Sequence, residues 1–233
     1  MKLARLAVDG AEVVATVDGD AATVLREGTQ WDLLGAAVAG TPPAANADRI
    51  PLSAARVLAP LDRPPSIRDF FAFEEHVRNS RVAAGMTVDP GWYERPLFYF
   101  TNPAAVRGPD DVITPPRGTR CLDYELEVAA VVGTEARDLD PDDPATMDVV
   151  AGWLILNDWS ARDVQTREMT QNLGPQKGKD FATSLGPWLV TRDEFGAGRT
   201  RPKGRMQARV NGQRWSDGEL SDIHFSWAQI LAH

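Results

Sequence analysis

Apolar and polar residues alternate over short runs along most of the chain, which is the pattern of β-strands. Residues 1 to about 40 carry three such runs, "KLARLAV", "EVVATVDG" and "AATVLREG", separated by Asp-Gly and Gly-Asp turn signals. From Pro96 onward the strand-like runs are "LFYFTN", "DVITPP", "YELEVAAVVG", "VVAGWLILND", "SLGPWLVT" and "RMQARVNGQRW", the last with an Asn-Gly hairpin signal. The pattern therefore predicts a mostly β protein with a few helices, of the α+β class.

Three segments carry helical spacing instead. In "SIRDFFAFEEHVRNSRVAAG", apolar residues recur every three to four positions, Asp69 opens the segment and Gly85 can end it. The segment "ARDVQTREMT" predicts a second helix, and "SWAQILAH" reads as the start of a third.

A connector rich in proline and alanine, "TPPAANADRIPLSAARVLAPLDRPPS", separates the first strands from the rest. We place a domain boundary inside it. Residues 1–60 are then a small N-terminal β-rich domain with its linker, and residues 61–233 form a larger domain.

Composition narrows the class of protein. A formal net charge of -8 argues against a broad nucleic-acid surface. No apolar run approaches the roughly 20 residues of a membrane span, so we expect no membrane insertion. The single cysteine, Cys121, allows no internal disulfide, which suits a reducing cytoplasm. We expect a cytoplasmic protein in which Cys121 is a small core residue.

Glu125 and Glu127 stand just before the apolar end of "YELEVAAVVG". Residues two apart in a strand point the same way, with backbone positions about 6.5 to 7 Å apart, so the two side chains share a face. Ionised carboxylates beside an apolar run repel each other unless a cation lies between them. The alternative is an edge strand whose polar face lies in water.

Two further carboxylates lie at the ends of other predicted elements. Asp158 ends the buried run "GWLILND" where a helix begins, so it could also be a helix N-cap. Asp69 opens the first predicted helix. Together with Glu125 and Glu127 these carboxylates would suit a hard cation such as Mg²⁺, Mn²⁺ or Ca²⁺, because no Cys or His ligand spacing accompanies them.

His76 follows Asp69 by seven residues, which is two turns along the predicted helix and nearly the same face. The rise per residue separates them by about 10 Å, which is too far for a shared ligand role and suitable for a base acting on a water near the cation. The alternative is a surface histidine.

Two cationic residues are also candidates. Lys179 lies in the Gly- and Pro-flanked loop "GPQKGKDFATSLGP", where the alternative is a solvent-facing lysine. Arg162 and Gln165 are three apart on the predicted helix after Asp158, so they could share a face toward the cation. Arg162 could equally pair with Asp163 or Glu168.

Four segments in this order, "RDFFAFEEH", "LDYELEVAAVVG", "LNDWSARDVQ" and "LGPQKGKDFATSLGPWLV", resemble the fumarylacetoacetase (fumarylacetoacetate hydrolase) family from about Ser66 to the chain end. The resemblance implies a mixed β-sandwich roll of the fumarylacetoacetase C-terminal type behind a small N-terminal β domain, usually as a homodimer. It also implies Mg²⁺ or Ca²⁺ in an acidic pocket and hydrolysis of a carbon–carbon bond in a 1,3-diketone acid.

The resemblance assigns roles to individual residues. Asp69, Glu125, Glu127 and Asp158 match the metal ligands of the family. His76 falls at the position of the general base, while Lys179 and Arg162 fall at catalytic positions. Arg162 and Gln165 also match substrate contacts, and Thr183 matches a residue near the metal.

The chain departs from the family at three points. Phe71 stands where the family has a substrate-facing tyrosine, and Met169 replaces another. These changes imply a different substrate pocket and a substrate other than fumarylacetoacetate. Relatives continue past the element that matches "SWAQILAH", so we expect the C-terminal part of the catalytic domain to be missing.

These expectations favour a metal-dependent hydrolase of a small acylpyruvate-like acid. A decarboxylase, hydratase or isomerase of a related 2-oxo acid is an alternative within enzymes, since the same metal-enolate chemistry serves all of them. His76 favours hydrolysis because decarboxylation has less need of a base for water. A non-catalytic metal- or ligand-binding homologue is the alternative from another class.

Overall fold

A computed structural model describes residues 1–40, 48–83, 85–172, 174–196 and 198–233. The chain forms two compact units. The first unit comprises residues 1–67, 101–134 and 150–194, and the second comprises residues 68–100, 135–149 and 195–233. Each unit is built from segments that are far apart in the sequence.

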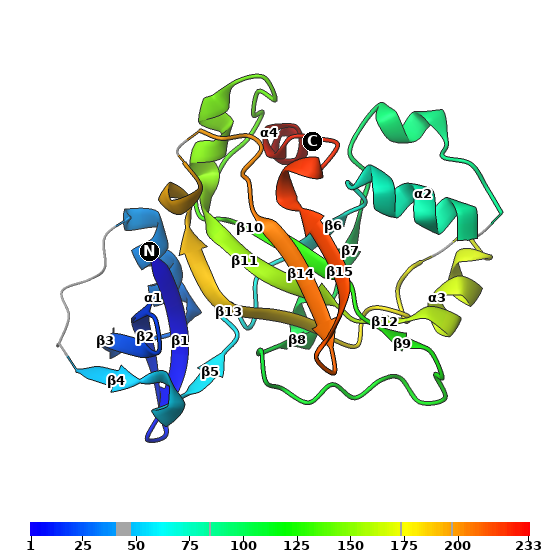
Figure 1. Ribbon diagram of the computed structural model, residues 1–233. Helices are drawn as coiled ribbons and strands as arrows, with labels where there is room; N and C mark the ends of the chain where they lie inside the picture. The colour runs from blue at the N-terminus through cyan, green and yellow to red at the C-terminus, as the bar shows by residue number, and fades with distance from the viewer. Residues whose placement is uncertain (41–47, 84, 173, 197) are drawn as a thin grey trace. The chain divides into compact units, whose positions relative to one another are not determined.

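The first unit is organised by one sheet whose strands run in the order β10-β11-β13-β1-β2-β3-β4, with β5 beside β1 and β8 beside β13 (Figure 1). All neighbours are antiparallel except β8 and β13. The strands are β1 (Lys2–Val8), β2 (Ala11–Asp18), β3 (Ala21–Glu27), β4 (Arg49–Pro51), β5 (Arg56–Leu58), β8 (Val106–Arg107), β10 (Leu126–Val132), β11 (Val150–Asp158) and β13 (Thr183–Thr191). Short elements complete this unit: η1 (Leu52–Ala54), η3 (Pro103–Ala105), β9 (Leu122–Asp123), β12 (Ser160–Ala161) and helix α3 (Arg162–Met169).

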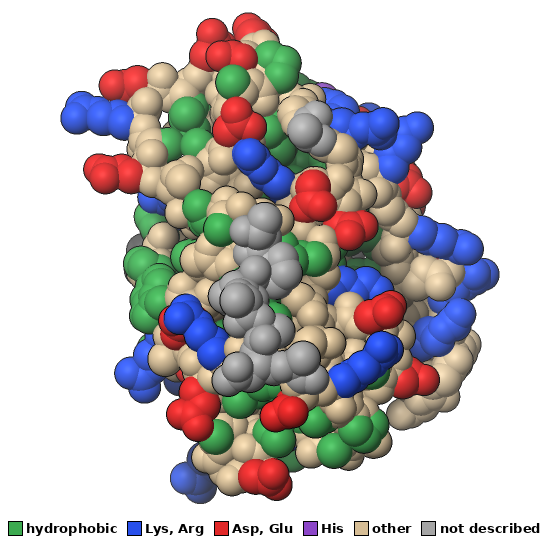
Figure 2. Space-filling model, turned by 90° about the vertical axis from the view of Figure 1, so that its left-hand side faces the viewer, with side chains coloured by type: hydrophobic (Ala, Val, Ile, Leu, Met, Phe, Trp, Pro, Cys, Tyr) green, Lys and Arg blue, Asp and Glu red, His purple; other side chains and the backbone are tan. Residues whose placement is uncertain are grey.

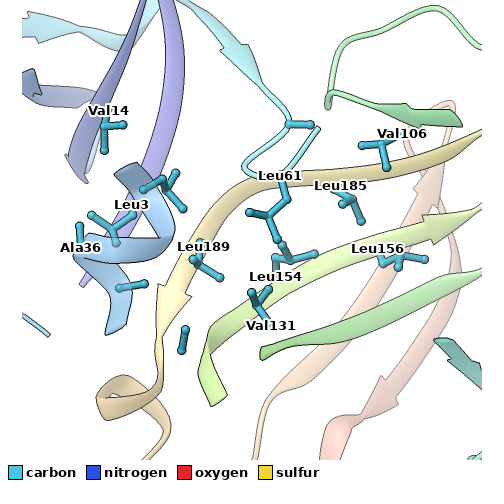
Figure 3. Packing of buried hydrophobic residues seen from close by; sticks show 14 of the residues in the cluster. Leu3, Val14, Ala36, Leu61, Val106, Val131, Leu154, Leu156, Leu185 and Leu189 are labelled. Carbon is cyan, nitrogen blue, oxygen red and sulfur yellow. The ribbon is translucent and has the colours of Figure 1, made fainter. Parts of the chain in front are cut away.

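One hydrophobic cluster joins the beginning of the chain to the later strands. Leu3 of β1 lies opposite Leu189 of β13, and both side chains are fully buried. Leu154 and Leu185 belong to the same cluster, which Figure 3 shows from close by. The first residues of the chain therefore share a core with β11 and β13.

Helix α1 (Gln30–Ala39) was not expected from the strand-like pattern of residues 1 to 40. Its apolar side, including Leu33 and Ala36, packs into the same hydrophobic cluster. The Thr29 side chain accepts from backbone N–H groups of the first turn and Asp32 accepts from the Thr29 backbone N–H, which is a capping box. Gly40 ends the helix with a positive φ of 67°. These end signals were present in the sequence.

The second unit contains helices α2 (Glu74–Ala83) and α4 (Trp227–Ala232) and the hairpin of β14 (Arg205–Val210) and β15 (Gln213–Glu219). Strands β6 (Ile67–Phe70) and β7 (Phe98–Thr101) pair with each other. Its 3₁₀ turns are η2 (Pro90–Tyr93), η4 (Pro144–Val149), η5 (Arg192–Phe195), which begins in the first unit, and η6 (Leu220–Asp222). The predicted hairpin is confirmed, since Asn211 and Gly212 both have positive φ, 51° and 80°.

Two predicted elements are wrong. The helix expected from Asp69 begins only at Glu74, because the preceding residues form β6 and Phe71 N–H donates to Leu97 O at 3.0 Å. "DVITPP" forms no strand. Its two prolines have no N–H to donate, and Val112 is 88% exposed.

The predicted fold class is confirmed: the described chain is mostly β with few helices. The predicted boundary near residue 60 stays a prediction, because compact units need not coincide with segments that fold independently. Part of the predicted connector, residues 41–47, lies outside the described residues.

Among the described residues, no helix is long and apolar enough to cross a membrane. Acidic and basic side chains are interspersed over the face drawn in Figure 2.

A substitution of Gly152, in the middle of β11, tests how closely β11 packs against the neighbouring strand β13. A Cβ atom there would lie 2.4 Å from the backbone carbonyl oxygen of Val190, and a paired strand cannot give way easily. We expect Gly152→Ala to lower the free energy of unfolding by about 1 to 3 kcal/mol in urea titrations. Gly218→Ala in β15 is the matched control, because its Cβ would meet no atom within 4 Å. Equal stability of the two variants would contradict this packing.

Candidate active site at the strand ends

The apolar face of the sheet ends in carboxylates. Side chains two apart along β11 share a face, so Asp158 lies on the same side as the core residues Leu154 and Leu156. Glu127 of β10 is the register partner of Leu156, and Thr183 of β13 is that of Asp158, so both lie on this side as well. Asp158 is fully buried. A charged cluster therefore continues a hydrophobic face at the point where three strands end or begin.

Glu127 and Asp158 come close enough to share a cation. Each offers a carboxylate oxygen within 4.8 Å of the other. Two carboxylates at this spacing, one half-buried and one fully buried, disfavour joint ionisation unless positive charge is supplied.

Lys179 supplies part of that charge. Its Nζ donates to Glu125 Oε2 at 2.5 Å and to the Asp158 carboxylate, and its side chain is only 3% exposed. Burial alone would lower the pKa of the ammonium, but the charges of Glu125 and Asp158 outweigh it and raise the pKa. The alternative of a solvent-facing lysine is therefore wrong.

Arg162, the first residue of α3, approaches Glu125 from the other side. Its Nη1 donates to Glu125 Oε1 at 2.6 Å and to Gln165 Oε1 at 3.0 Å, and its Nε donates to Asp123 Oδ2 at 2.8 Å. Burial tends to raise the pKa of Glu125, but Lys179 and Arg162 together hold it below its ordinary value. Glu125 is thus ionised between two cations.

The geometry decides between the alternatives left by the sequence for Arg162. Arg162 and Gln165 do share a side of α3. The alternative partners of Arg162 are engaged elsewhere: Asp163 accepts from Thr119 Oγ1 and the Arg120 backbone N–H, and Glu168 accepts from backbone N–H groups of residues 177 and 178.

Asp158 is not a helix N-cap. The short strand β12 follows it, α3 begins only at Arg162, and the residue at the N-cap is Ala161, which makes no side-chain cap hydrogen bond. The Asp158 backbone N–H donates to Glu125 O at 3.2 Å, which continues the pairing of the strands.

The two remaining polar candidates lie in the second unit. Asp69 is half-buried on β6 and accepts from Tyr99 Oη at 3.2 Å. His76 is exposed on α2, and its ring meets the ring of Phe71 edge-on, with centroids 5.2 Å apart. The prediction that Asp69 and His76 lie two turns apart on one helix is wrong, because Asp69 belongs to a strand.

The two apolar candidates differ in exposure. Met169 ends α3 and is 56% exposed, while Phe71 is half-buried in the second unit. Cys121 is exposed, so its expected place in the core is wrong.

Sequence reasoning gave Asp123 no role, although it stands two residues before Glu125 and holds the guanidinium of Arg162. The Asp-x-Glu-x-Glu spacing was the available signal.

The donor set fits a hard divalent cation. Glu127 and Asp158 offer only oxygen ligands, and no cysteine or histidine accompanies them in this cluster of the described first unit. Thr183 is 1% exposed, and its buried hydroxyl has no hydrogen-bond partner among the described residues. A buried hydroxyl oxygen of this kind can coordinate a cation or accept a hydrogen bond from a water molecule bound to the cation.

Comparison with known proteins agrees with this fold. The profile described as fumarylacetoacetate (FAA) hydrolase C-terminal matches residues 66–233. The chain therefore belongs to the fumarylacetoacetate hydrolase family, which confirms the resemblance seen in the motifs.

Curated relatives include fumarylacetoacetase of Arabidopsis thaliana, 36% identical over 145 residues, which are 54% of this chain and 34% of that protein. Fumarylacetoacetase of Oryza sativa subsp. japonica is 33% identical over 164 residues, 62% of this chain and 37% of that protein. The chain thus matches little more than a third of the length of either plant enzyme.

Solved structures share the fold. A fumarylacetoacetate hydrolase from Exiguobacterium antarcticum superposes with a TM-score of 0.76 at 25% identity, covering 100% of this chain and 80% of that one. A 5-carboxymethyl-2-hydroxymuconate delta-isomerase from Mycobacterium smegmatis has a TM-score of 0.73 at 22% identity, with 100% and 81% covered. The family fold therefore serves proteins named as hydrolases and as isomerases.

Lys179→Met tests the charge cluster. The variant leaves Glu125 and Asp158 without their shared ammonium, so we expect the free energy of unfolding to fall by about 3 to 5 kcal/mol. Denaturant titration measures this loss. Lys203→Met at an exposed position is the control, with an expected change within about 0.5 kcal/mol. If both variants are equally stable, Lys179 does not neutralise the buried carboxylates.

Proposed function

We propose that this chain carries the catalytic part of a divalent-metal-dependent hydrolase that cleaves a carbon–carbon bond in a 1,3-diketone acid of the acylpyruvate type. The observation that carries the proposal is the pair of the half-buried Glu127 and the fully buried Asp158, with Glu125 held between Lys179 and Arg162, in a chain of this family.

Charge favours a divalent ion at this site. Three negative charges come from Glu125, Glu127 and Asp158. Two positive charges, on Lys179 and Arg162, oppose them. Asp123 also engages Arg162, so the cluster keeps a negative balance. We propose Mg²⁺ as the ion, with Ca²⁺ or Mn²⁺ as alternatives, held by Glu125, Glu127, Asp158 and, from the second unit, Asp69.

The bound cation would supply Lewis acidity for the oxygens of the dicarbonyl. The protein side chains would bind the substrate, stabilise the developing negative charge and transfer the proton. Arg162 has a planar fork of N–H donors, which suits a substrate carboxylate, and Gln165 steadies that fork through a 3.0 Å hydrogen bond. Lys179 would place positive charge beside the oxygen on which negative charge develops. His76 would take a proton from the attacking water.

Phe71 and Met169 would contact the acyl end of the substrate. Both are apolar where the family has hydrogen-bonding side chains, so we propose an acyl group that needs no hydrogen-bond partner there. Fumarylacetoacetate, with its second carboxylate, fits this proposal poorly.

A decarboxylase, hydratase or isomerase of a related 2-oxo acid is the second candidate, supported by the isomerase among the structural neighbours. A non-catalytic metal- or ligand-binding homologue is the third. We further propose that the protein works as a cytoplasmic homodimer on a small-molecule acid, without nucleic acid or membrane.

A substrate panel separates these candidates. We expect purified protein with Mg²⁺ to remove the enol absorbance of an acylpyruvate and to release pyruvate and the free acid, identified by mass spectrometry. A chelator should abolish this loss. Release of carbon dioxide or an isomerised product of unchanged mass would favour the second candidate. No metal-dependent change with any diketone acid would favour the non-catalytic homologue.

His76→Ala tests the proposed base. We expect kcat to fall by about 10²- to 10⁴-fold, the usual contribution of a general base, while the affinity for Mg²⁺ measured by calorimetry stays the same. His233→Ala, an exposed histidine at the end of the described chain, serves as the control. Full activity of His76→Ala would remove the base assignment.

A further inference from the structure

The loop that delivers Lys179 has little regular structure of its own. Residues 174–182 between α3 and β13 contain neither helix nor strand, and residues 177–181 form turns. Yet the Lys179 side chain is buried and its Nζ contacts two carboxylates, so its backbone has little freedom to shift. Something outside the loop must fix its position.

Glu168 on α3 provides the main attachment. Its Oε1 accepts from the Lys177 backbone N–H at 2.8 Å and its Oε2 from the Gly178 backbone N–H at 3.0 Å. Each carboxylate oxygen thus binds one of two consecutive peptide groups. Hydrogen bonds to an ionised acceptor are stronger than neutral ones.

Two further contacts hold the same loop against α3. A Cβ at Gly178 would lie 2.8 Å from the backbone nitrogen and Cα of Gln165, so only glycine allows this approach. The Gly178 carbonyl oxygen accepts from the Ala161 N–H at 2.7 Å. The loop therefore lies directly on the first turns of the helix.

Helix α3 consequently fixes both cations of the site. Arg162 at its start binds Glu125 directly, and Glu168, six residues later, holds the loop that brings Lys179 to the other oxygen of Glu125. We infer that Glu168 is a positioning residue for the proposed reaction, which sets Lys179 at the site through the backbone of residues 177 and 178. Only the expected effect of Glu168 on catalysis rests on the proposed function; its effect on the position of Lys179 does not.

Amine labelling tests the positioning without any substrate. The chain has four lysines, Lys2, Lys177, Lys179 and Lys203. In the native wild-type protein, sulfosuccinimidyl acetate should modify the exposed Lys177 and spare the buried Lys179, as read by mass spectrometry of the peptide that holds both. In Glu168→Ala we expect modification of Lys179 relative to Lys177 to rise at least about tenfold, because local opening exposes it.

Two variants serve as matched comparisons. Glu168→Gln keeps the shape and one accepting oxygen, so it should give intermediate labelling, and it remains informative if the alanine variant fails to fold. Arg167→Ala changes the neighbouring exposed residue of α3 and should label as the wild type does. Unchanged protection of Lys179 in both Glu168 variants, or equal exposure in Arg167→Ala, would overturn the inference.

Kinetics separate positioning from general stability. With a substrate that the wild type turns over, Glu168→Ala should lower kcat by about 10- to 100-fold, because a shift of about 1 Å in a catalytic group has that effect. KM and Mg²⁺ affinity should change less than about twofold, and Glu168→Gln should recover part of kcat. Unchanged kcat would overturn the positioning role. If the wild type turns over no substrate, the proposed function fails while the labelling result still decides the placement of Lys179.

Discussion

The site depends on the burial of like charges at the end of an apolar sheet face. Asp158 and Glu127 extend the side of β10 and β11 that packs the hydrophobic core, so water cannot screen them fully. Such carboxylates remain ionised only beside positive charge. The ammonium of Lys179 meets part of this demand, and the proposed divalent cation would meet the rest. The proposed chemistry and the stability of the first unit thus depend on the same buried charges.

Helix α3 and the loop after it carry the positive charges that these carboxylates need. Positive charge must approach Glu125 from two directions, and Arg162 and Lys179 do so from positions seventeen residues apart in sequence. Glu168 and Gly178 hold the loop against the helix and so link the two cations to one element. The second unit contributes Asp69 and His76 to the proposal from strand β6 and helix α2.

Local pattern predicted most strands, because period-two alternation and Asn-Gly or Asp-Gly turns act over a few residues. The same reasoning failed around Asp69, where aromatic residues at positions 67–73 fit helical spacing but β6 pairs with the distant β7. It also missed α1, whose Thr29–Asp32 capping box was readable. The acidic residues could be singled out from their spacing. The ion pairs of Lys179 and Arg162 could not, since they join segments more than 20 residues apart. The sequence singled out these two residues and the family resemblance assigned their roles, but their partners required the structure.

Anomalous diffraction from crystals grown with Mn²⁺ tests whether Glu127 and Asp158 share a divalent cation. We expect one strong peak in contact with carboxylate oxygens of Glu127 and Asp158, at about 2.1 Å, the spacing typical of small hard divalent ions. A map without a peak there, with Lys179 still bonded to Asp158 and manganese bound only at unrelated surface carboxylates, would contradict it.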